Sequence, residues 1–504
     1  MIPRSNAPRN LISVLLLGVA LLFAAGCHEN RFHPVDYQGG IDIFDDLFAV
    51  SVPSADHIVA GGYWGAIYVS TDGGNSFKKG DTGTDSPIND VSMADTKSGW
   101  AVGQLGLLLR TEDGGLSWTR QGNPKLGTNH LFSIQALDAD RAWAVGDWGT
   151  RIYTDDGGKT WSDHSLTIDE AHPQFVWLSL ADQDRVRAGE NVFEDVGLND
   201  VYCLPADTNR CWMIGEFGYI FRTATGGISE DGSLAWERGQ IDSGFDLDPI
   251  ALGYNSVDIP KVGSASITRL AEAIASAEHL NIAIEPRINQ AEIDAFGDES
   301  DPYPLFELIE ARTQEVQTIV EDAGILSDRI RRRGAPPWDY EEFIAEDPGF
   351  LKRYYESRLR KTPGVEVEIS QNPVLFAVRF QDPQQGLISG LGGVILKSSN
   401  GGESWTYENV GRKQALFSVQ PLPKRAITVG EKGFVRLSED GGRTWNEVPG
   451  FPTLFTFMRD VAFDPDGRVG FVVGQRGTVL RSDDSGQSWS RVLPPPNDAR
   501  IKGV

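Results

Sequence analysis

The chain is poor in cysteine, histidine and basic residues. Its 504 residues include 3 Cys and 7 His, and 46 Lys and Arg stand against 71 Asp and Glu, a formal net charge of −25. So few cysteines exclude a disulfide-built miniature scaffold and a Cys-rich metal domain. The acidic balance argues against a protein that coats nucleic acid by neutralising phosphates. We therefore expect no metal, no cofactor and no nucleic-acid partner.

Long apolar runs and common catalytic signatures are also scarce. The sequence contains no G-x-S-x-G and no P-loop motif. Its one long apolar run, Leu11–Ala25, has 15 residues, fewer than the roughly 20 that a transmembrane helix needs. Arg4 and Arg9 precede this run, which is typical of a signal peptide.

The apolar run ends in Ala24-Ala25-Gly26-Cys27, which resembles a bacterial lipobox. This resemblance implies a signal peptide over 1–26, lipidation of Cys27 and a tether over 27–44. His28 follows the cysteine, as in lipoproteins sorted to the outer membrane. We therefore expect an extracytoplasmic protein, lipid-anchored on the periplasmic side of the outer membrane. A plain secretory signal with an incidental cysteine is the alternative.

A glycine-anchored repeat governs the rest of the chain. WAVGQLGLLLRTEDGGLSW ends at Trp118, and WAVGDWGTRIYTDDGGKTW ends at Trp161. Seven copies are recognisable, and their uninterrupted spacings are 41, 43, 40 and 44 residues, the length of a four-stranded propeller blade. The anchoring glycines are Gly62, Gly103, Gly146, Gly215, Gly390, Gly430 and Gly474.

Each copy predicts four strands. A run such as LFSIQAL comes first, a second apolar run ends at the anchoring glycine, a G-x-x-G turn follows, and a third strand leads to S/T-x-D-x-G-x-S/T-W. This last string is the Asp-box, or bacterial neuraminidase repeat. Its aspartate can accept backbone N–H groups across the turn, and its Trp can pack beneath it. We interpret these residues as structural rather than as calcium or sugar ligands: Asp72, Asp113, Asp156, Asn400, Asp440 and Asp484.

Two intervals between anchoring glycines are too long for one blade. Gly146 to Gly215 spans 69 residues, and Gly215 to Gly390 spans 175. The predicted fold is therefore all-β: a seven-bladed β-propeller with a mainly α-helical insertion between blades four and five. Blades one to four occupy 45–240 with a smaller insertion at about 163–198, the large insertion occupies 241–370, blades five to seven occupy 371–493, and 494–504 is a tail.

Apolar stripes at helical spacing support a helical insertion. Ile267, Leu270 and Ile274 form one stripe, and a longer stripe runs from Leu305 to Ile330. Arg331-Arg332-Arg333 before Gly334 predicts a helix end. The stripes predict either docking onto the propeller or an arm that binds a partner.

The repeats resemble the photosystem II stability/assembly factor family of seven-bladed propellers. RTEDGGLSW at 110–118 and LSEDGGRTW at 437–445 come close to the family's repeat. The resemblance implies a non-enzymatic, extracytoplasmic factor that assists assembly of a membrane or envelope protein complex. The family also carries arginines ahead of the box, here Arg110, Arg222 and Arg481, with Lys397 in blade five. They predict either inter-blade pairing or a basic patch for an acidic partner.

A carbohydrate-binding or glycoside-hydrolysing propeller is the alternative function, because Asp-boxes also occur in sialidases. Glycosidases need two carboxylates about 5–5.5 Å or 6.5–9.5 Å apart. Asp147 and Glu216 lie in equivalent turns of consecutive blades and are the best candidates. The F/Y-R-I-P motif of sialidases does not follow the signal segment. We therefore assign no catalytic residue.

Cys203 and Cys211 flank LPADTNR, between the first two strands of blade four. Outside the cytoplasm, a disulfide between these strands is the favoured interpretation, and two free buried thiols are the alternative.

The G-x-x-G turns direct the search for function. Strand alternation places them, with both insertions, on one face of the propeller and the Asp-boxes on the other. Large aromatic side chains are rarely needed at turn tips, and they dominate binding energy where they meet a partner. The predicted partner-binding residues on this face are Trp64, Trp148, Phe217, Asp147, Glu216, Lys432 and Arg476. Burial of the aromatics beneath the insertions is the alternative.

Overall fold

The structure is a computed structural model of the whole chain. It describes residue 43 and residues 45–492, except 123–127, 173, 176–177, 230–233, 243–246, 276–279, 299, 334–344, 346–348, 371–372, 412 and 453. The predicted signal peptide, Cys27, most of the tether and the C-terminal tail lie outside the described residues.

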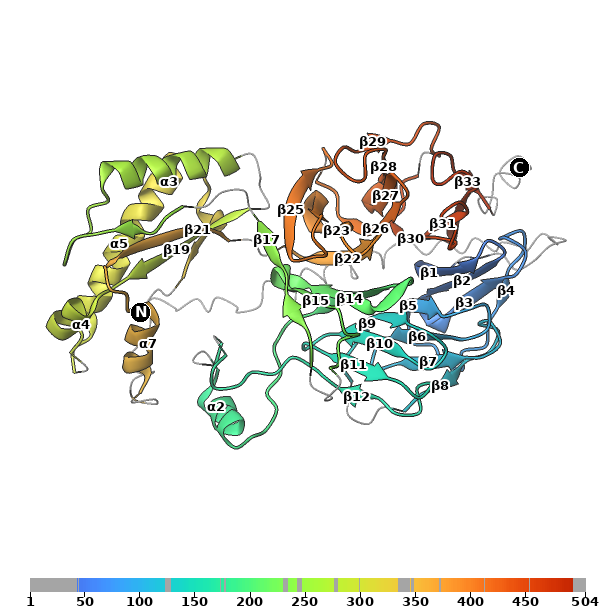
Figure 1. Cartoon of the computed structure of the whole chain (residues 1–504), viewed down its shortest axis with the longest axis horizontal. Coiled ribbons are helices and arrows are strands. Elements are labelled where there is room, and N and C mark those ends of the chain that lie inside the picture. Colours follow the sequence, from blue (N-terminus) through green and yellow to red (C-terminus); the bar gives the residue numbers. More distant parts are fainter. Residues whose placement is uncertain are drawn as a thin grey trace, which may run out of the picture. The chain divides into compact units, whose positions relative to one another are not determined.

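The described strands form seven antiparallel sheets in which four consecutive strands pair in chain order (Figure 1). The first four blades are β1 (Leu47–Ser54), β2 (His57–Gly62), β3 (Ile67–Ser70) and β4 (Lys78–Lys79); β5 (Ile88–Met93), β6 (Gly99–Gly103), β7 (Leu108–Thr111) and β8 (Thr119–Arg120); β9 (Leu131–Ala136), β10 (Ala142–Gly146), β11 (Arg151–Thr154) and β12 (Ser162–Asp163); and β13 (Leu198–Leu204), β14 (Asp207–Gly215), β15 (Ile220–Thr223) and β16 (Glu237–Arg238).

The last three blades follow the large insertion. They are β22 (Leu375–Phe380), β23 (Gly386–Gly390), β24 (Val394–Ser398) and β25 (Ser404–Asn409); β26 (Leu416–Leu422), β27 (Arg425–Gly430), β28 (Val435–Ser438) and β29 (Asn446–Glu447); and β30 (Met458–Phe463), β31 (Gly470–Gly474), β32 (Thr478–Ser482) and β33 (Ser490–Arg491). A further strand, β17 (Gln240–Asp242), pairs in parallel with β25 at the outer edge of blade five.

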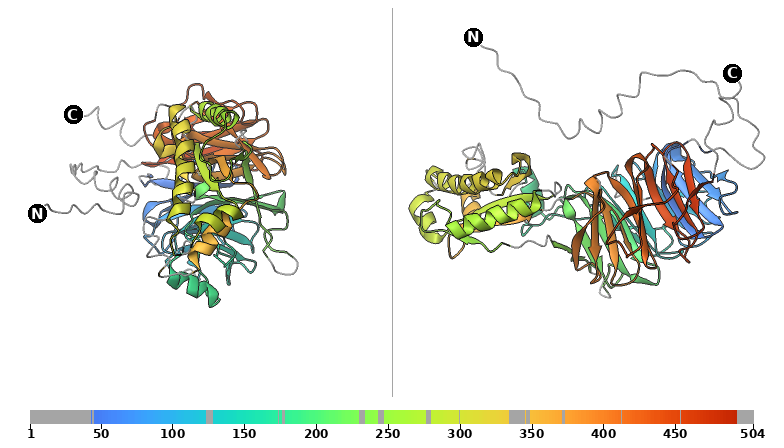
Figure 2. Two further views of the ribbon diagram at one scale, coloured as in Figure 1. Left: turned by 90° about the vertical axis from the view of Figure 1, so that its left-hand side faces the viewer. Right: turned by 90° about the horizontal axis from the view of Figure 1, so that it is seen from above.

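The sheets stand side by side around a central axis (Figures 1 and 2). The first strand of each blade contacts the first strand of the next, from β1 through β5, β9, β13, β22 and β26 to β30, and β30 contacts β1. Five of the seven second strands are buried along their whole length, for example HIVAGG of β2 and GWAVG of β6, because each sheet packs against a neighbour on both faces. This is a β-propeller, and the prediction of a mainly β fold made of four-stranded antiparallel sheets is confirmed.

The ring closes without exchange of a strand between the described ends. The strands of the first and the last blade each come from one continuous stretch of chain. The join is made by apolar packing of Val50, Ile58 and Phe77 with Phe471 and Val473. Two hydrogen bonds add to it, from Val50 N to the Asp460 carboxylate (2.9 Å) and from Gly477 N to Asp45 O (3.0 Å).

The described residues of the smaller insertion include a short helix, α2 (Leu180–Arg187). The large insertion contains α3 (Lys261–Ile274), α4 (Gln290–Phe296), α5 (Tyr303–Asp322) and α7 (Phe350–Arg358). The helices predicted from the two apolar stripes are present: Ile267, Leu270 and Ile274 are buried on α3, and Leu305 and Val316 are buried on α5.

The large insertion also holds a four-stranded sheet that the sequence analysis did not predict. Its order is β18 (Ile250–Ala251), β21 (Gly364–Ser370), β19 (Asn281–Arg287) and β20 (Ile330–Arg332). The predicted helix end at Arg331–Arg333 is wrong, because α5 ends at Asp322 ahead of Gly324 (φ +92°), and Ile330 enters a strand parallel to β19. The insertion is therefore a mixed α and β unit.

A candidate binding face around the central channel

The G-x-x-G turns need glycine for two different reasons. The anchoring residue Gly62 is extended (φ −166°), but a Cβ there would lie 2.1 Å from Asp46 O. The last residue of the turn, Gly65, has φ +63°, the left-handed conformation that glycine tolerates best. Close approach of the preceding chain, rather than backbone freedom, therefore accounts for the anchoring glycine.

The second tip residue of the turn points outward and is exposed. In blades one to four it is Trp64, Leu105, Trp148 and Phe217, whose exposed fractions are 71%, 55%, 49% and 54%. In blades five to seven it is Gly392, Lys432 and Arg476. We call the side of the propeller that carries these turns the tip face. It presents an apolar arc over four blades and a basic pair over the last two.

The six side chains at this position stand on a strained backbone. Their φ angles lie between 53° and 58°, a left-handed conformation that costs non-glycine residues about 1–2 kcal/mol. Asparagine or glycine would occupy the position at lower cost. Large side chains held exposed on such a backbone are typical of a binding surface.

The first tip residue has a structural role. The Glu216 carboxylate accepts the backbone N–H of Gly197 (3.1 Å), and the Glu431 carboxylate accepts that of Ala415 (3.2 Å). Asp147 occupies the same position, partly buried, and burial raises the pKa of its carboxyl group. The Glu216 carboxylate therefore supports its turn, whereas Asp147 Oδ1 is buried without a hydrogen-bond partner among the described residues.

The mouth of the central channel opens on the tip face as a cavity of about 380 Å³. The second residue of each first strand lines it, so every blade contributes a first-strand side chain, and Tyr63 and Gln104 of the turns complete the lining. In blade order the first-strand residues are Phe48, Asn89, Phe132, Asn199, Phe376, Phe417 and Arg459. The recurring LF string of the sequence thus marks channel-facing phenylalanines.

The neck of the channel lies one residue further along the first strands and is acidic. Asp90 accepts Ile134 N (2.8 Å), and Asp200 accepts Val378 N (2.8 Å). Asp460 accepts Val50 N in the same way. Each of the three aspartates thus joins its own blade to the first strand of the next blade. One basic residue, Arg379, pairs with Asp200 (2.5 Å). The sequence signal was available, since N-D-V or R-D-V replaces F-A-V or F-S-V in blades two, four and seven.

The Asp-boxes lie on the opposite face and bond within themselves. The Asp113 carboxylate accepts Ser117 N (2.9 Å) and the Ser117 hydroxyl (2.6 Å), and Trp118 Nε1 donates to Gly115 O (2.9 Å). The other boxes repeat the aspartate or asparagine contacts, at Asp72, Asp156, Asn400, Asp440 and Asp484. These hydrogen bonds lower the pKa of Asp156 to about 2.

In blade four the tryptophan of the Asp-box lies further along the chain from the box glycines than in the other blades that have one. Thr225 replaces the aspartate, and its hydroxyl reaches only the Thr223 hydroxyl (3.3 Å). Trp236 lies against Gly227 and meets Trp143 of blade three edge to face at 5.5 Å. The sequence analysis ended this copy at Gly227 and missed Trp236. The reason is that more residues separate Gly227 from Trp236 than separate Gly115 from Trp118 in a regular box.

The basic residues ahead of the boxes bind backbone carbonyls. Arg110 is buried, lies over the Trp100 ring and donates to Ala139 O of the next blade (2.7 Å). Lys397 donates to Gly441 O of the next blade (2.7 Å), and Arg481 donates to Gly73 O of blade one. Arg222 instead pairs with Glu237 of its own blade. These contacts hold neighbouring blades, or strands of one blade, together. Because the contacts occupy the four basic side chains, little of a basic patch remains at these positions.

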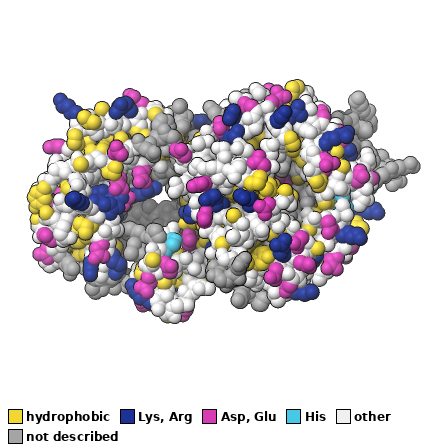
Figure 3. Space-filling model, viewed as in Figure 1, with side chains coloured by type: hydrophobic (Ala, Val, Ile, Leu, Met, Phe, Trp, Pro, Cys, Tyr) yellow, Lys and Arg dark blue, Asp and Glu magenta, His cyan; other side chains and the backbone are white. Residues whose placement is uncertain are grey.

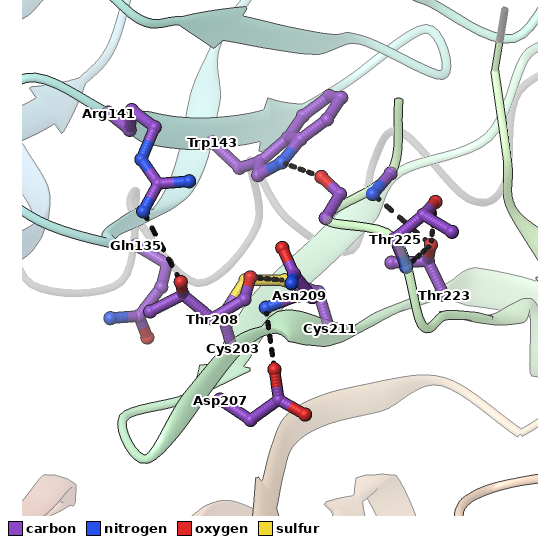
Figure 4. The surroundings of a disulfide bond; sticks show 12 residues. Gln135, Arg141, Trp143, Cys203, Asp207, Thr208, Asn209, Cys211, Thr223 and Thr225 are labelled. Carbon is purple, nitrogen blue, oxygen red and sulfur yellow. Dashed lines mark hydrogen bonds between the residues drawn. A yellow bond between two sulfur atoms is a disulfide. The ribbon is translucent and has the colours of Figure 1, made fainter. Parts of the chain in front are cut away.

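Cys203 and Cys211 are directly opposite in the β13–β14 hairpin and are joined by a disulfide (Figure 4). Close to it, Arg141 of blade three donates to the Thr208 hydroxyl (3.4 Å) and Trp143 Nε1 donates to Gly226 O (3.0 Å). The disulfide therefore braces the hairpin of blade four where it meets blade three.

One tyrosine–glutamate pair bears on the alternative of a glycosidase. The Tyr219 hydroxyl donates to Glu194 (2.6 Å), and Arg238 lies over the Tyr219 ring at 3.9 Å. Neither member of the pair lines the channel cavities. The pair packs the first insertion against blade four and gives no support to hydrolysis.

The described part of the chain lacks both a helix suited to crossing a membrane and a residue cluster suited to a metal ion. No helix there is long and apolar enough to cross a membrane. No cluster of three or more His, Cys, Asp or Glu there could hold a metal ion. On the face seen in Figure 3, acidic and basic side chains alternate without a broad patch of one sign.

Comparison with known proteins gives one family match. The model of a family described as photosynthesis system II assembly factor YCF48 matches residues 81–174, which span blades two and three. The chain matches no curated protein.

Similar solved structures include two of YCF48. YCF48 bound to D1 peptide is 16% identical, with 88% of this chain and 95% of that chain covered and a TM-score of 0.47. YCF48 from Cyanidioschyzon merolae is 14% identical, with 88% and 96% covered and a TM-score of 0.47. The WD40 β-propeller domain of Doa1 is 10% identical, with 87% and 92% covered and a TM-score of 0.43.

Proposed function

We propose that this protein is a non-enzymatic, extracytoplasmic accessory or assembly factor that binds a membrane or envelope protein complex through its tip face. The observation that carries the proposal is the apolar arc, in which four consecutive blades hold Trp64, Leu105, Trp148 and Phe217 exposed on left-handed backbone. The family match adds support, because that family is described as an assembly factor.

The charge pattern indicates what kind of partner would fit. Lys432 and Arg476 extend the ring of tips beyond the apolar arc, in a chain whose net charge is −25. A partner with an apolar patch beside acidic residues would match this face. Anchoring through Cys27 is part of the proposal and rests on the Ala24-Ala25-Gly26-Cys27 string.

The test replaces the aromatic tips. The triple variant Trp64→Ala, Trp148→Ala and Phe217→Ala should lose co-purification with envelope proteins, because exposed aromatic anchors contribute about 2 kcal/mol or more each at interfaces. Its melting temperature should stay near that of the wild type, since the three side chains are about half exposed or more.

A matched control lies on the Asp-box face. Leu116 is 41% exposed there, and Leu116→Ala should keep every partner. A triple variant that retains its partners would contradict the proposal. Wild-type protein that binds or cleaves glycans and captures no protein would favour the carbohydrate-active alternative instead.

A further inference from the structure

Arg459 stands in an aromatic cage at the channel mouth. Its guanidinium lies 5.7 Å from the ring centre of Phe48, 4.5 Å from that of Phe417 and 5.4 Å from that of Phe457. Phe417 in turn contacts Phe376 and Phe457, with ring centres 5.7 Å and 5.9 Å apart. The cage holds the planar cation at the edge of the cavity and leaves the phenyl rings partly open to it.

The guanidinium is not neutralised by the described residues around it. Its Nε is buried without a hydrogen-bond partner. Asp46 and Glu431 act on it electrostatically but form no ion pair with it, and it is the one charged member of the described lining of the mouth. A guanidinium that is held in a partly buried site without an acceptor costs free energy, which an anionic ligand that reaches its terminal N–H groups would recover.

The two asparagines at the mouth already donate to backbone carbonyls. The side-chain amide of Asn89 donates to Leu131 O (2.7 Å), and that of Asn199 donates to Leu375 O (2.8 Å). Tyr63 and Gln104 also line the mouth but are uncharged, so Arg459 is the donor of the described lining that can neutralise an anion.

The channel below the mouth limits how deeply an anionic group can bind. Under the mouth the space narrows to about 90 Å³ beside Asp90, Asp200 and Asp460. Arg379 lies at the same depth and pairs with Asp200, so Asp460 is the carboxylate that repels a negative group there, joined by Asp90 above its pKa of about 7. The anionic group of a ligand would therefore sit at the level of Arg459, and the uncharged part of the same ligand would lie against the phenylalanines.

We propose that the mouth binds a small organic acid with one carboxylate on an aromatic or branched apolar body. A single guanidinium matches one carboxylate through two parallel hydrogen bonds, and the nearby acidic groups disfavour a dianion such as a phosphate monoester. About 380 Å³ lies at the lower end of small-molecule pockets. This inference goes beyond the proposed function and does not depend on it.

Calorimetric titration of the mature protein tests the inference. 3-Phenylpropanoate should bind with a dissociation constant of about 0.1–1 mM, the range for ligands of this size. Its uncharged amide, 3-phenylpropanamide, should bind at least about tenfold more weakly, because it cannot pair with Arg459.

Variants separate the mouth from general surface charge. Arg459→Met keeps an apolar stem in the cage and should weaken 3-phenylpropanoate binding at least about tenfold. Arg459→Lys keeps the charge without the planar fork and should lose about three- to tenfold, which serves as the second variant if the methionine lowers the melting temperature. Arg120→Met removes an exposed arginine of blade two that is neither a turn tip nor part of the mouth lining, and it should leave binding unchanged.

Three outcomes would overturn the inference. They are equal affinity for acid and amide, unchanged binding by both Arg459 variants, and no saturable binding up to about 10 mM, well above the expected range. A short peptide ending in phenylalanine with a free carboxylate, compared with its amide, forms a further arm. Arg459-dependent binding of that peptide without binding of 3-phenylpropanoate would assign the mouth to polypeptide ends and refute the small acid.

Discussion

Asp90 has an environment unlike that of the box aspartates. Burial and the nearby carboxylates Asp200 and Asp460 raise its pKa to about 7, against hydrogen bonds from Ile134 N and the Ser133 hydroxyl that lower it. In the unfolded chain the pKa of an aspartate is about 3.9. Between these values the native state keeps a proton that the unfolded state has lost.

The contribution of Asp90 to the free energy of unfolding should therefore fall as pH rises from about 4 to about 7, since the unfolded state binds fewer protons than the native state in this window. Asp90→Asn keeps an acceptor for Ile134 N and does not titrate. We expect the stability of the wild type relative to this variant to drop by at least about 1 kcal/mol between pH 5 and pH 8. Urea unfolding at both pH values measures it, and parallel pH profiles of the two proteins would contradict it.

At the scale of one element, the Asp-box turn can be compared within the molecule. Six blades have an aspartate or asparagine that accepts the N–H four residues on, as Asp113 does from Ser117. Blade four has Thr225 instead, yet Gly226 and Gly227 keep φ angles of 76° and 90°, close to the 79° and 94° of Gly114 and Gly115. The glycines, with the Thr223 hydroxyl that accepts Thr225 N and Gly227 N, thus maintain the turn without the aspartate, which elsewhere adds hydrogen bonds to it.

Two reciprocal substitutions test that assignment. Asp113→Ala should destabilise the protein by about 1–3 kcal/mol, because it leaves the turn donors without an acceptor. Thr225→Asp should stabilise it by about 1 kcal/mol by accepting Ser229 N. Ala224→Asp adds the same charge next to the site and should bring no gain. Denaturant unfolding measures all three, and equal effects of the two aspartates would sink the assignment.

At the scale of the whole propeller, the first and last blades are held together by contacts rather than by a shared sheet. Asp460 accepts both Val50 N and the Ser418 hydroxyl (2.8 Å), so its carboxylate connects blades six, seven and one. Residues 410 apart in the chain therefore meet at the join.

Asp460→Ala should cost about 2–4 kcal/mol, because it leaves donors in a packed join unpaired. Asp483→Ala removes an exposed carboxylate from the same blade and should cost less than about 1 kcal/mol, since its pair with Arg481 is at the surface. Thermal and urea unfolding distinguish the two. If the two variants lose similar stability, Asp460 does not hold the join.

What the sequence alone determined is the part of this protein encoded by short, repeated patterns. The spacing of the anchoring glycines, the G-x-x-G turns and the boxes predicted the strands and the two faces, because turn chemistry and strand alternation act within a few residues. The apolar stripes predicted α3 and α5 for the same reason.

Tertiary structure decided what depends on residues from different repeats. The mouth joins one residue from each of seven first strands, and Arg459 acquires its cage only when Phe48 and Phe417 of the neighbouring blades come within reach. The sheet of the insertion pairs β19 with β21, more than 75 residues apart, so no local period announced it. Spacing along the chain specifies which way a side chain faces, but closure of the ring decides what it meets there.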